Sequence, residues 1–153
     1  MPTEPGTTAE DYSLLLEDQL CFALYAASRA VTARYRPLLD ELGLTYPQYL
    51  VMLVLWEREP LSVGDIGAAL QLESSTLSPL IKRLETAGLV VRRRSPDDER
   101  SVVVALTGKG REMRQQACAV PPVIGDAMGL TAEQRGTAME LLRTLTAGVA
   151  RSE

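Results

Sequence analysis

The sequence of 153 residues contains no histidine and only two cysteines. Without histidine, neither a Ser-His-Asp triad nor a Cys-His pair can form, and the usual zinc ligand sets are missing. The cysteines, Cys21 and Cys118, lack a CxxC spacing, so they indicate neither a zinc site nor a disulfide framework, and such usage fits a reducing compartment. We therefore expect a protein that is not an enzyme and that needs neither cofactor nor metal.

Long apolar runs and a signal segment are also missing. The longest apolar stretches, such as residues 49–56, are far shorter than the roughly 20 residues of a membrane span, and residues 1–10 have neither a basic nor an apolar signal region. Those first ten residues are rich in Thr, Pro and Gly, which predicts a flexible N-terminal tail. We expect residues 11–153 to form one domain in the cytoplasm, with no membrane partner.

Apolar spacing predicts helices at both ends of that domain. Apolar residues recur at three- and four-residue steps from Asp11 to about Leu42, which predicts one long first helix bent near Pro37. Thr45 to Gln48 form a capping box, which opens a second helix running to about Arg58. Residues 11–60 are thus predicted to be N-terminal helices that carry Cys21.

The C-terminal part, residues 108–153, is predicted to be helical as well. Thr107 begins one helix, and Pro121-Pro122 must break or bend it, because proline lacks the N–H that an inner helical position needs. Thr131 to Gln134 form another capping box, which opens a last helix that runs close to the C-terminus.

Between these helical parts, residues 61–107 predict a helix-turn-helix followed by a hairpin. Ser62 opens a short helix to about Leu70, and a second helix follows from about Ser74 to Ala87, ended by Gly88. The β-branched runs at residues 89–91 and 101–106 flank a polar loop, Arg92–Arg100, and read as two strands of a wing. The predicted fold is therefore mainly α with a small β-hairpin, a winged helix-turn-helix.

The charge pattern favours DNA as the partner of this part. The net charge of the chain is −4, yet the segment from Lys82 to Arg100 holds six basic residues against four acidic ones. In a helix-turn-helix the second helix enters the major groove with its N-terminal side chains, and arginines of a wing fit a narrow minor groove. The predicted DNA-binding residues are Ser74, Ser75, Thr76, Ser78, Pro79, Lys82, Arg83, Arg92, Arg93, Arg94, Asp98 and Arg100.

Pro79 and Asp98 have particular consequences for the helix and for the wing. The whole set of residues also has simpler explanations that do not involve DNA. Pro79 falls after the first turn of its helix, where it costs a hydrogen bond. Asp98 is expected to hold the Arg100 side chain, since carboxylate pairing with arginine is directional. A solvated polar helix start and a surface ion-pair cluster explain the same residues without DNA.

Several segments resemble the MarR family of bacterial regulators. The resemblance is carried by residues 75–90, with the sequence STLSPLIKRLETAGLV, by Asp97–Ser101 and by Leu106–Gly110. It implies a homodimer whose first and last helices intertwine as N- and C-terminal dimerisation helices. It also implies two winged heads on a pseudo-palindromic double-stranded operator, usually as a repressor.

Cys21 is the candidate for a chemical input. Placed deep inside the predicted first helix, it has no helix N-terminus to favour a thiolate, so nearby hydrogen-bond donors must do so. Tyrosine hydroxyls are candidates, but Tyr35 lies fourteen residues further along the same helix, about 21 Å at the helical rise. Tyr35 therefore cannot touch Cys21 of its own subunit.

The N-terminal helices resemble the OhrR subgroup of organic hydroperoxide sensors. The resemblance is carried by residues 21–29, 35–39, 44–50 and 55–57. It implies that Cys21 is the peroxidatic cysteine and that Tyr35 and Tyr46 of the other subunit hydrogen-bond its sulfur. Oxidation of Cys21 by an organic hydroperoxide would then release the repressor from DNA.

Cys118 departs from the pattern of that subgroup. Members with an intersubunit disulfide carry a resolving cysteine near the position of Gly125 or Asp126, whereas Cys118 precedes Val120. Either Cys118 resolves Cys21 of the partner, or a low-molecular-weight thiol does.

Other interpretations stay open at this point. Phe22, Leu24, Met52 and Trp56 form either a pocket for organic hydroperoxides or part of the core. A MarR-type repressor released by a small phenolic ligand would leave Cys21 as a packing residue. A thiol peroxidase would be expected to show a CxxC motif or a βαβ pattern, and the sequence has neither.

Overall fold

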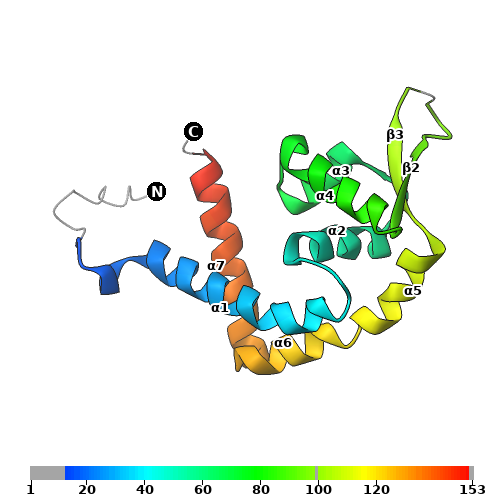
Figure 1. The fold of residues 1–153 in the computed structure, drawn as a ribbon. Helices are drawn as coiled ribbons and strands as arrows, with labels where there is room; N and C mark the ends of the chain where they lie inside the picture. Colours follow the sequence, from blue (N-terminus) through cyan, green and yellow to red (C-terminus); the bar gives the residue numbers. More distant parts are fainter. Residues whose placement is uncertain (1–12, 99, 152–153) are drawn as a thin grey trace.

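The computed structural model describes residues 13–98 and 100–151, so the predicted tail at residues 1–10 lies outside them. The chain is mainly helical, with a three-stranded antiparallel sheet of strand order β1-β3-β2 (Figure 1). The helices are α1 Leu20–Asp40, α2 Tyr46–Glu57, α3 Val63–Leu70, α4 Ser74–Thr86, α5 Gly108–Ala117, α6 Val120–Met128 and α7 Ala132–Arg151. The strands are β1 Leu61–Ser62, β2 Val90–Arg94 and β3 Val102–Leu106. Within the described ranges, no helix is both long and apolar enough to cross a membrane.

The first long helix starts later than the sequence predicts. A short 3₁₀ helix occupies Leu16–Asp18, and Gln19 then has extended backbone, so α1 begins only at Leu20. The Gln19 side chain donates to the carbonyl oxygens of Ser13 and Leu15, which holds the chain in this non-helical entry. The prediction of one helix from Asp11 is therefore wrong at its start, although Pro37 does lie inside α1.

Capping residues set the starts of α2, α3, α5 and α7 as predicted. Thr45 and Gln48 form a capping box at α2, and Thr131 and Gln134 exchange the same two bonds before α7. The Ser62 hydroxyl accepts from the Asp65 N–H at α3, and Thr107 caps α5 in the same way. Side-chain caps of this kind satisfy N–H groups that the helix itself leaves free, which is why they locate a boundary.

The two prolines after α5 have the predicted effect. Helix α5 ends at Ala117, and α6 begins at Val120 with prolines in its first turn. At that position the missing N–H costs no helical hydrogen bond.

The sheet differs from the predicted hairpin in two respects. Strand β1 adds a third strand, pairing Leu61 with Val104, and its two residues are too few to show an alternating pattern. Strand β2 extends through Arg92, Arg93 and Arg94, because these pair with β3 up to Val102. The prediction that these three arginines lie in the loop is therefore wrong, because the loop spans only residues 95–101.

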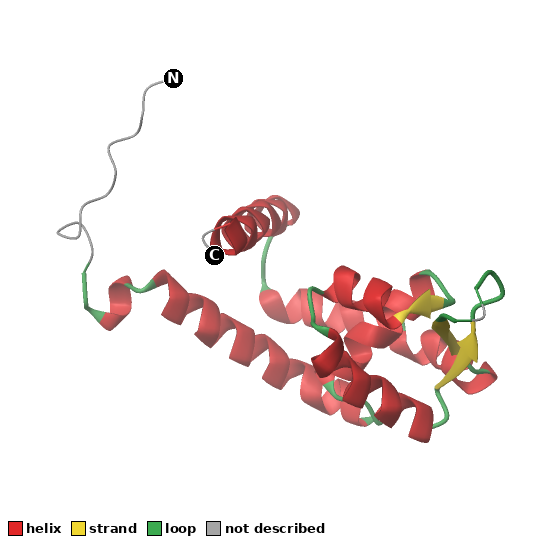
Figure 2. Cartoon of the chain, turned by 90° about the horizontal axis from the view of Figure 1, so that it is seen from above, coloured by secondary structure: helices red, strands yellow, loops and turns green. Residues whose placement is uncertain are grey.

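The core lies inside the winged helix, between α2, α3, α4 and the sheet, and extends to Leu39 of α1 and to Val120 and Ile124 of α6. Its largest fully buried side chains include Leu39, Met52, Leu55, Ile66, Leu77, Ile81 and Leu84. Helix α6 packs on α1 below this core. The N-terminal part of α1 projects away from it, as Figure 2 shows.

Helix α7 has no comparable packing. Among its residues Ala132–Arg151, all of which the structure describes, none is buried. Large apolar side chains are exposed along the start of α1, at the end of α6 and along α7: Leu20, Phe22, Tyr25, Met128, Leu130, Met139, Leu141, Leu142 and Val149. Apolar side chains exposed together in this way, in contrast to single scattered ones, mark an interaction site.

Candidate functional site

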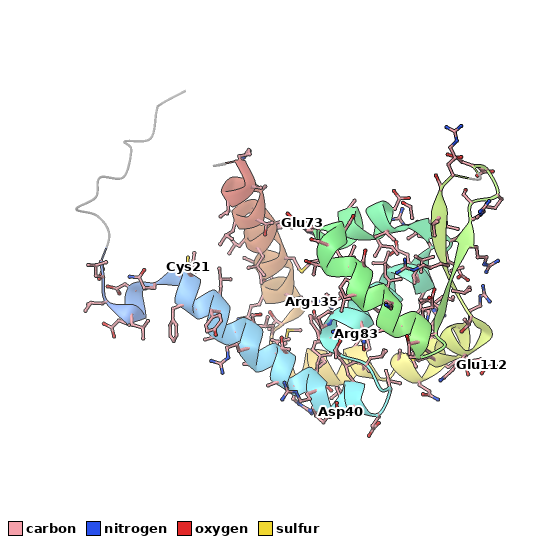
Figure 3. All side chains as sticks on the ribbon, turned by 45° about the horizontal axis from the view of Figure 1, so that its top comes forward. Cys21, Asp40, Glu73, Arg83, Glu112 and Arg135 are labelled. Atoms are coloured by element: carbon pink, nitrogen blue, oxygen red, sulfur yellow. The ribbon has the colours of Figure 1, made fainter. Side chains whose placement is uncertain are left out.

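Helix α4 presents the predicted DNA-binding residues on one exposed face. Leu77, Leu80, Ile81 and Leu84 are buried on the other face and fix its orientation against α2 and α3. The predicted residues of α4 are all exposed: Ser74, Ser75, Thr76, Ser78, Pro79, Lys82 and Arg83. Figure 3 labels Arg83 on this helix. The packing thus leaves a polar and basic face of α4 exposed.

The start of α4 resolves the question about Pro79. Glu73 is the N-cap residue and makes no side-chain cap hydrogen bond, so the three polar side chains after it are not used up in capping. Pro79 lies inside the helix and is exposed, so the carbonyl of Ser75 receives no bond from an N–H at that position.

The wing carries its arginines on a strand rather than on a loop. Arg92, Arg93 and Arg94 are exposed on β2, and Nε of Arg92 lies 3.8 Å from Oε2 of Glu85 on α4. An exposed ion pair at this distance contributes little stability, but it brings the Arg92 side chain beside α4.

Asp98 organises the backbone of the wing tip. Its carboxylate accepts from the Arg100 N–H at 3.0 Å and from the Ser101 hydroxyl at 3.2 Å. The Ser95 N–H donates to the Ser101 carbonyl at 2.8 Å, which closes the loop. The predicted role of Asp98 in holding the Arg100 side chain is thus replaced by a role in shaping the turn. Glu99 lies outside the described residues.

Cys21 lies at the very start of α1, which corrects the sequence analysis. It is the second residue of the helix and is exposed, at the end that projects away from the winged helix (Figure 3). The error came from the assumption that the helix begins at Asp11. The first N–H groups of a helix have no partner within it, and the helix dipole favours an anion there.

The tyrosines gather at the other end of α1. The ring centroids of Tyr35 and Tyr46 are 4.8 Å apart, and that of Tyr49 is 5.7 Å from Tyr35. Trp56 continues the group, with its ring 6.5 Å from that of Tyr49. Tyr35, Tyr46 and Tyr49 together form the tyrosine cluster.

The cluster combines buried rings with available hydroxyl groups. Burial, and then the neighbouring tyrosines, raise the pKa of Tyr35 and of Tyr49 above the ordinary value, so both phenols stay protonated. Within the described part of the chain, the hydroxyl groups of Tyr35 and Tyr46 make no hydrogen bond. Both are therefore donors available to a group from outside the chain.

Tyr49 was missed as a member of this cluster. Only Tyr35 and Tyr46 were predicted from the sequence, although Tyr49 follows Tyr46 by three residues and so shares its face of α2. Spacing on the helix was the signal that could have identified it.

Cys118 lies beside the cluster. It follows the last residue of α5, is exposed, and contributes to the raised pKa of Tyr49 as the smallest of four causes. It also lines a cavity of 310 Å³ together with Tyr49, Leu53, Trp56, Glu57, Arg114, Ala117 and Pro121. The structure thus places Cys118 near the tyrosines, while Cys21 lies at the far end of α1.

The predicted apolar pocket does not form as a unit. Met52 is fully buried in the core, whereas Phe22 is exposed next to Cys21. Trp56 packs against the core and its indole N–H donates to the Gly110 carbonyl at 2.9 Å. Core packing is therefore the better explanation for Met52 and Trp56.

Comparison with known proteins gives consistent matches. Residues 33–117 match the family model of the transcriptional regulator SarA/Rot. The chain is 48% identical over 129 residues to the organic hydroperoxide resistance transcriptional regulator of Bacillus subtilis, which covers 84% of this chain and 85% of that protein.

Two solved structures extend these matches. Overoxidised AbfR of Staphylococcus epidermidis, bound to DNA, is 39% identical, with a TM-score of 0.72 over 88% of this chain and 94% of that one. The transcriptional repressor CouR, bound to a 23-mer DNA duplex, is 28% identical, with a TM-score of 0.77 over 86% of this chain and 94% of that one. The winged helix, the sequence identity and the family model agree, so this chain belongs to the MarR family of DNA-binding transcriptional regulators, in the group similar to organic hydroperoxide sensors.

Proposed function

We propose that this protein is a redox-sensing repressor, which binds operator DNA as a reduced homodimer and is released when an organic hydroperoxide oxidises Cys21. The observation that carries the proposal is the separation of Cys21 from the tyrosine cluster. Cys21 lies at the start of α1, whereas Tyr35 lies near the other end of α1 and packs against Tyr46 of α2, and the hydroxyl groups of Tyr35 and Tyr46 are available. A second subunit, running antiparallel along the exposed apolar surface, would bring its Cys21 to these hydroxyls.

The position of Cys21 suits a peroxidatic thiolate. The start of α1 favours an anion, and two tyrosine donors of the partner would add hydrogen bonds to the sulfur. The thiolate attacks the terminal oxygen of the hydroperoxide ROOH, the O–O bond breaks, and the transferred oxygen keeps its proton. The other oxygen leaves as the alkoxide RO⁻, which takes a proton from water and becomes the alcohol ROH. Cys21 becomes a sulfenic acid, which no longer accepts the tyrosine bonds as a thiolate does.

Cys118 is the thiol that we propose for the next step. It lies beside Tyr49, so a partner Cys21 that reaches the tyrosine cluster also comes near Cys118. Condensation of the Cys118 thiol with the sulfenic acid forms an intersubunit disulfide and releases water. A low-molecular-weight thiol would give a mixed disulfide by the same chemistry. AbfR, the relative described above, has solved structures in reduced, overoxidised and disulfide-formed states.

The DNA-bound form uses the exposed face of α4 and the β2 arginines. Ser74, Ser75, Thr76 and Ser78 face the base edges, while Lys82, Arg83 and the arginines of the wing approach phosphates and the minor groove. Two such heads in one dimer would read a pseudo-palindromic operator.

An operator-binding assay on Cys21→Ser tests the proposal. The reduced unmodified protein and the variant should bind equally, and only the unmodified protein should lose affinity after cumene hydroperoxide, with a smaller loss after the same dose of hydrogen peroxide. The matched control is Cys118→Ser, which should still be released but form no intersubunit disulfide on a non-reducing gel. Release of Cys21→Ser by cumene hydroperoxide would refute the thiol switch.

One cavity favours a second candidate, a repressor released by a small phenolic ligand. It has a volume of 480 Å³, lies between α1 and α6, and is lined by Ala27, Ala30, Val31, Arg34, Ile124, Ala127, Met128 and Leu130. Its walls are almost wholly apolar, and Arg34 is its single charged group. Release of both unmodified protein and Cys21→Ser by salicylate, with no response of either to hydroperoxide, would support this alternative.

A further inference from the structure

The first turn of α5 is bonded to α2 and to the base of the wing. The Trp56 indole of α2 donates to the Gly110 carbonyl at 2.9 Å. Just after α2, Oε1 of Glu59 accepts from Nε of Arg111 at 2.7 Å, and its other carboxylate oxygen accepts from the Leu106 N–H at the end of β3. The end of α2 is thus held to α5 and β3 together.

The same turn of α5 is bonded to the end of the DNA-reading helix. The Thr107 hydroxyl donates to the Gly88 carbonyl at 2.6 Å, and the Thr107 N–H donates to the Leu89 carbonyl at 3.0 Å. The Lys109 ammonium donates to the Ala87 carbonyl at 3.1 Å. A Cβ on Gly110 would lie 2.2 Å from the Leu89 oxygen, so the two backbones are in direct contact. Because of these contacts, α5 and the end of α4 cannot shift independently.

Helix α2 also reaches the tyrosine cluster. Tyr46 is its first residue and Tyr49 lies in its first turn, while Trp56 lies near its end. The ring of Tyr49 contacts that of Trp56 edge-on at 6.5 Å. Helix α2 therefore connects the tyrosine cluster to the first turn of α5, which is bonded to the end of α4.

We infer that α2 and the first turn of α5 transmit the state of the tyrosine cluster to the DNA-reading helix, with the Trp56–Gly110 hydrogen bond as the link. The inference rests on the proposed function, in which oxidation of Cys21 changes the bonds of the tyrosines. Trp56 is a positioning residue in this scheme, acting through α5. Rigid helices and hydrogen-bond networks carry such coupling when they take two discrete arrangements, one for each state of the tyrosine cluster.

The test separates oxidation of Cys21 from its effect on DNA. Cys21 sulfenic acid is trapped with dimedone and followed by mass spectrometry, and operator affinity is measured by fluorescence anisotropy. The coupling ratio is the operator Kd of oxidised protein divided by that of reduced protein. In Trp56→Phe, which keeps an aromatic ring but loses the N–H, we expect unchanged oxidation, a reduced-state Kd within about twofold, and a coupling ratio about fivefold lower. That factor corresponds to the roughly 1 kcal/mol of a typical hydrogen bond.

Two further variants complete the design. Glu59→Gln preserves the side-chain shape but removes the charge opposite Arg111 and one of the two acceptor oxygens, because an amide nitrogen cannot accept from Arg111 or from the Leu106 N–H. Its coupling ratio should fall by at least about twofold. Thr86→Val is the matched control, because its hydroxyl bond to the Lys82 carbonyl stays within α4; its ratio should not change. Wild-type coupling ratios in both Trp56→Phe and Glu59→Gln would overturn the inference. Full DNA affinity of the oxidised unmodified protein would instead refute the proposed function.

Discussion

The hydroxyl groups of Tyr35 and Tyr46 are the residue-scale feature on which the thiol chemistry depends. Replacing Tyr46 by Phe keeps the ring in the tyrosine cluster and removes one donor to the partner's thiolate. We expect the rate of Cys21 oxidation by cumene hydroperoxide to fall about tenfold, since a hydrogen bond to a charged group contributes about 1.5 kcal/mol or more. Dimedone trapping over time measures this rate.

The control for this variant is Tyr25→Phe. Tyr25 lies on α1 outside the tyrosine cluster and is 60% exposed. Its replacement should leave the rate unchanged. Equal rates for Tyr46→Phe and the unmodified protein would remove the tyrosines from the mechanism.

Burial of the tyrosines predicts a pH dependence of stability. Their pKa is raised in the folded chain, so above the ordinary tyrosine pKa the folded state binds more protons than the unfolded state. The free energy of unfolding should therefore be unaffected below about pH 9 and should fall as the pH rises through about 10. Urea unfolding at a series of pH values measures this, and Tyr49→Phe should show a shallower decline. An identical decline in both proteins would contradict the assignment to Tyr49.

At the scale of elements, the contact between α5 and the end of α4 depends on a glycine. In Gly110→Ala the new Cβ would meet the Leu89 carbonyl oxygen at 2.2 Å, so the two segments must separate. We expect a loss of at least about 2 kcal/mol in the free energy of unfolding. Gly108→Ala is the matched control, since nothing lies within 4 Å of its Cβ and it belongs to the same turn. Equal stability of the two variants in chemical denaturation would show that the contact is loose.

The exposed face of α4 predicts a salt-dependent effect on DNA binding. Lys82→Ala should weaken operator and unrelated DNA alike, and should reduce the slope of log affinity against log salt by about 1. Arg36→Ala removes the same charge from α1, away from this face, and should leave the slope unchanged. A change of slope in Arg36→Ala but not in Lys82→Ala would place the DNA on another surface.

At the scale of the whole molecule, the exposed apolar surface predicts a dimer. Leu141 and Val149 are 64% and 65% exposed and lie eight residues apart, on one face of α7. Leu141→Asp with Val149→Asp should give a monomer in light scattering and at least a tenfold loss of operator affinity, because a single head makes half of the contacts. Ala147→Asp is the control, because Ala147 is exposed and lies six residues from Leu141 and two from Val149, on another face of α7. A double variant that remains dimeric would exclude this face of α7 from the interface.

The features that local chemistry decides were predicted correctly. The capping boxes at Thr45 and Thr131, the end of α4 at Gly88 and the break before Pro121 all depend on residues within a few positions of each other. The exposed polar face of α4 followed from the same local pattern, since apolar spacing defines the opposite face. Composition alone already removed histidine chemistry, and apolar spacing predicted the helices.

The features that were missed depend on distant partners. Strand β1 exists because Leu61 finds Val104, and β2 extends through Arg94 because Val102 lies opposite. Helix α1 begins at Leu20, which moves Cys21 from the inside of a helix to its start. Only the tertiary structure joined Tyr49, Trp56 and Cys118 to the two predicted tyrosines, since packing of α1, α2 and α5 brings together residues up to 83 positions apart. The sequence by itself determined which helices form, because caps, prolines and apolar spacing act over one or two turns. The tertiary structure decided which of those residues meet, because contacts between elements depend on how whole helices and strands pack.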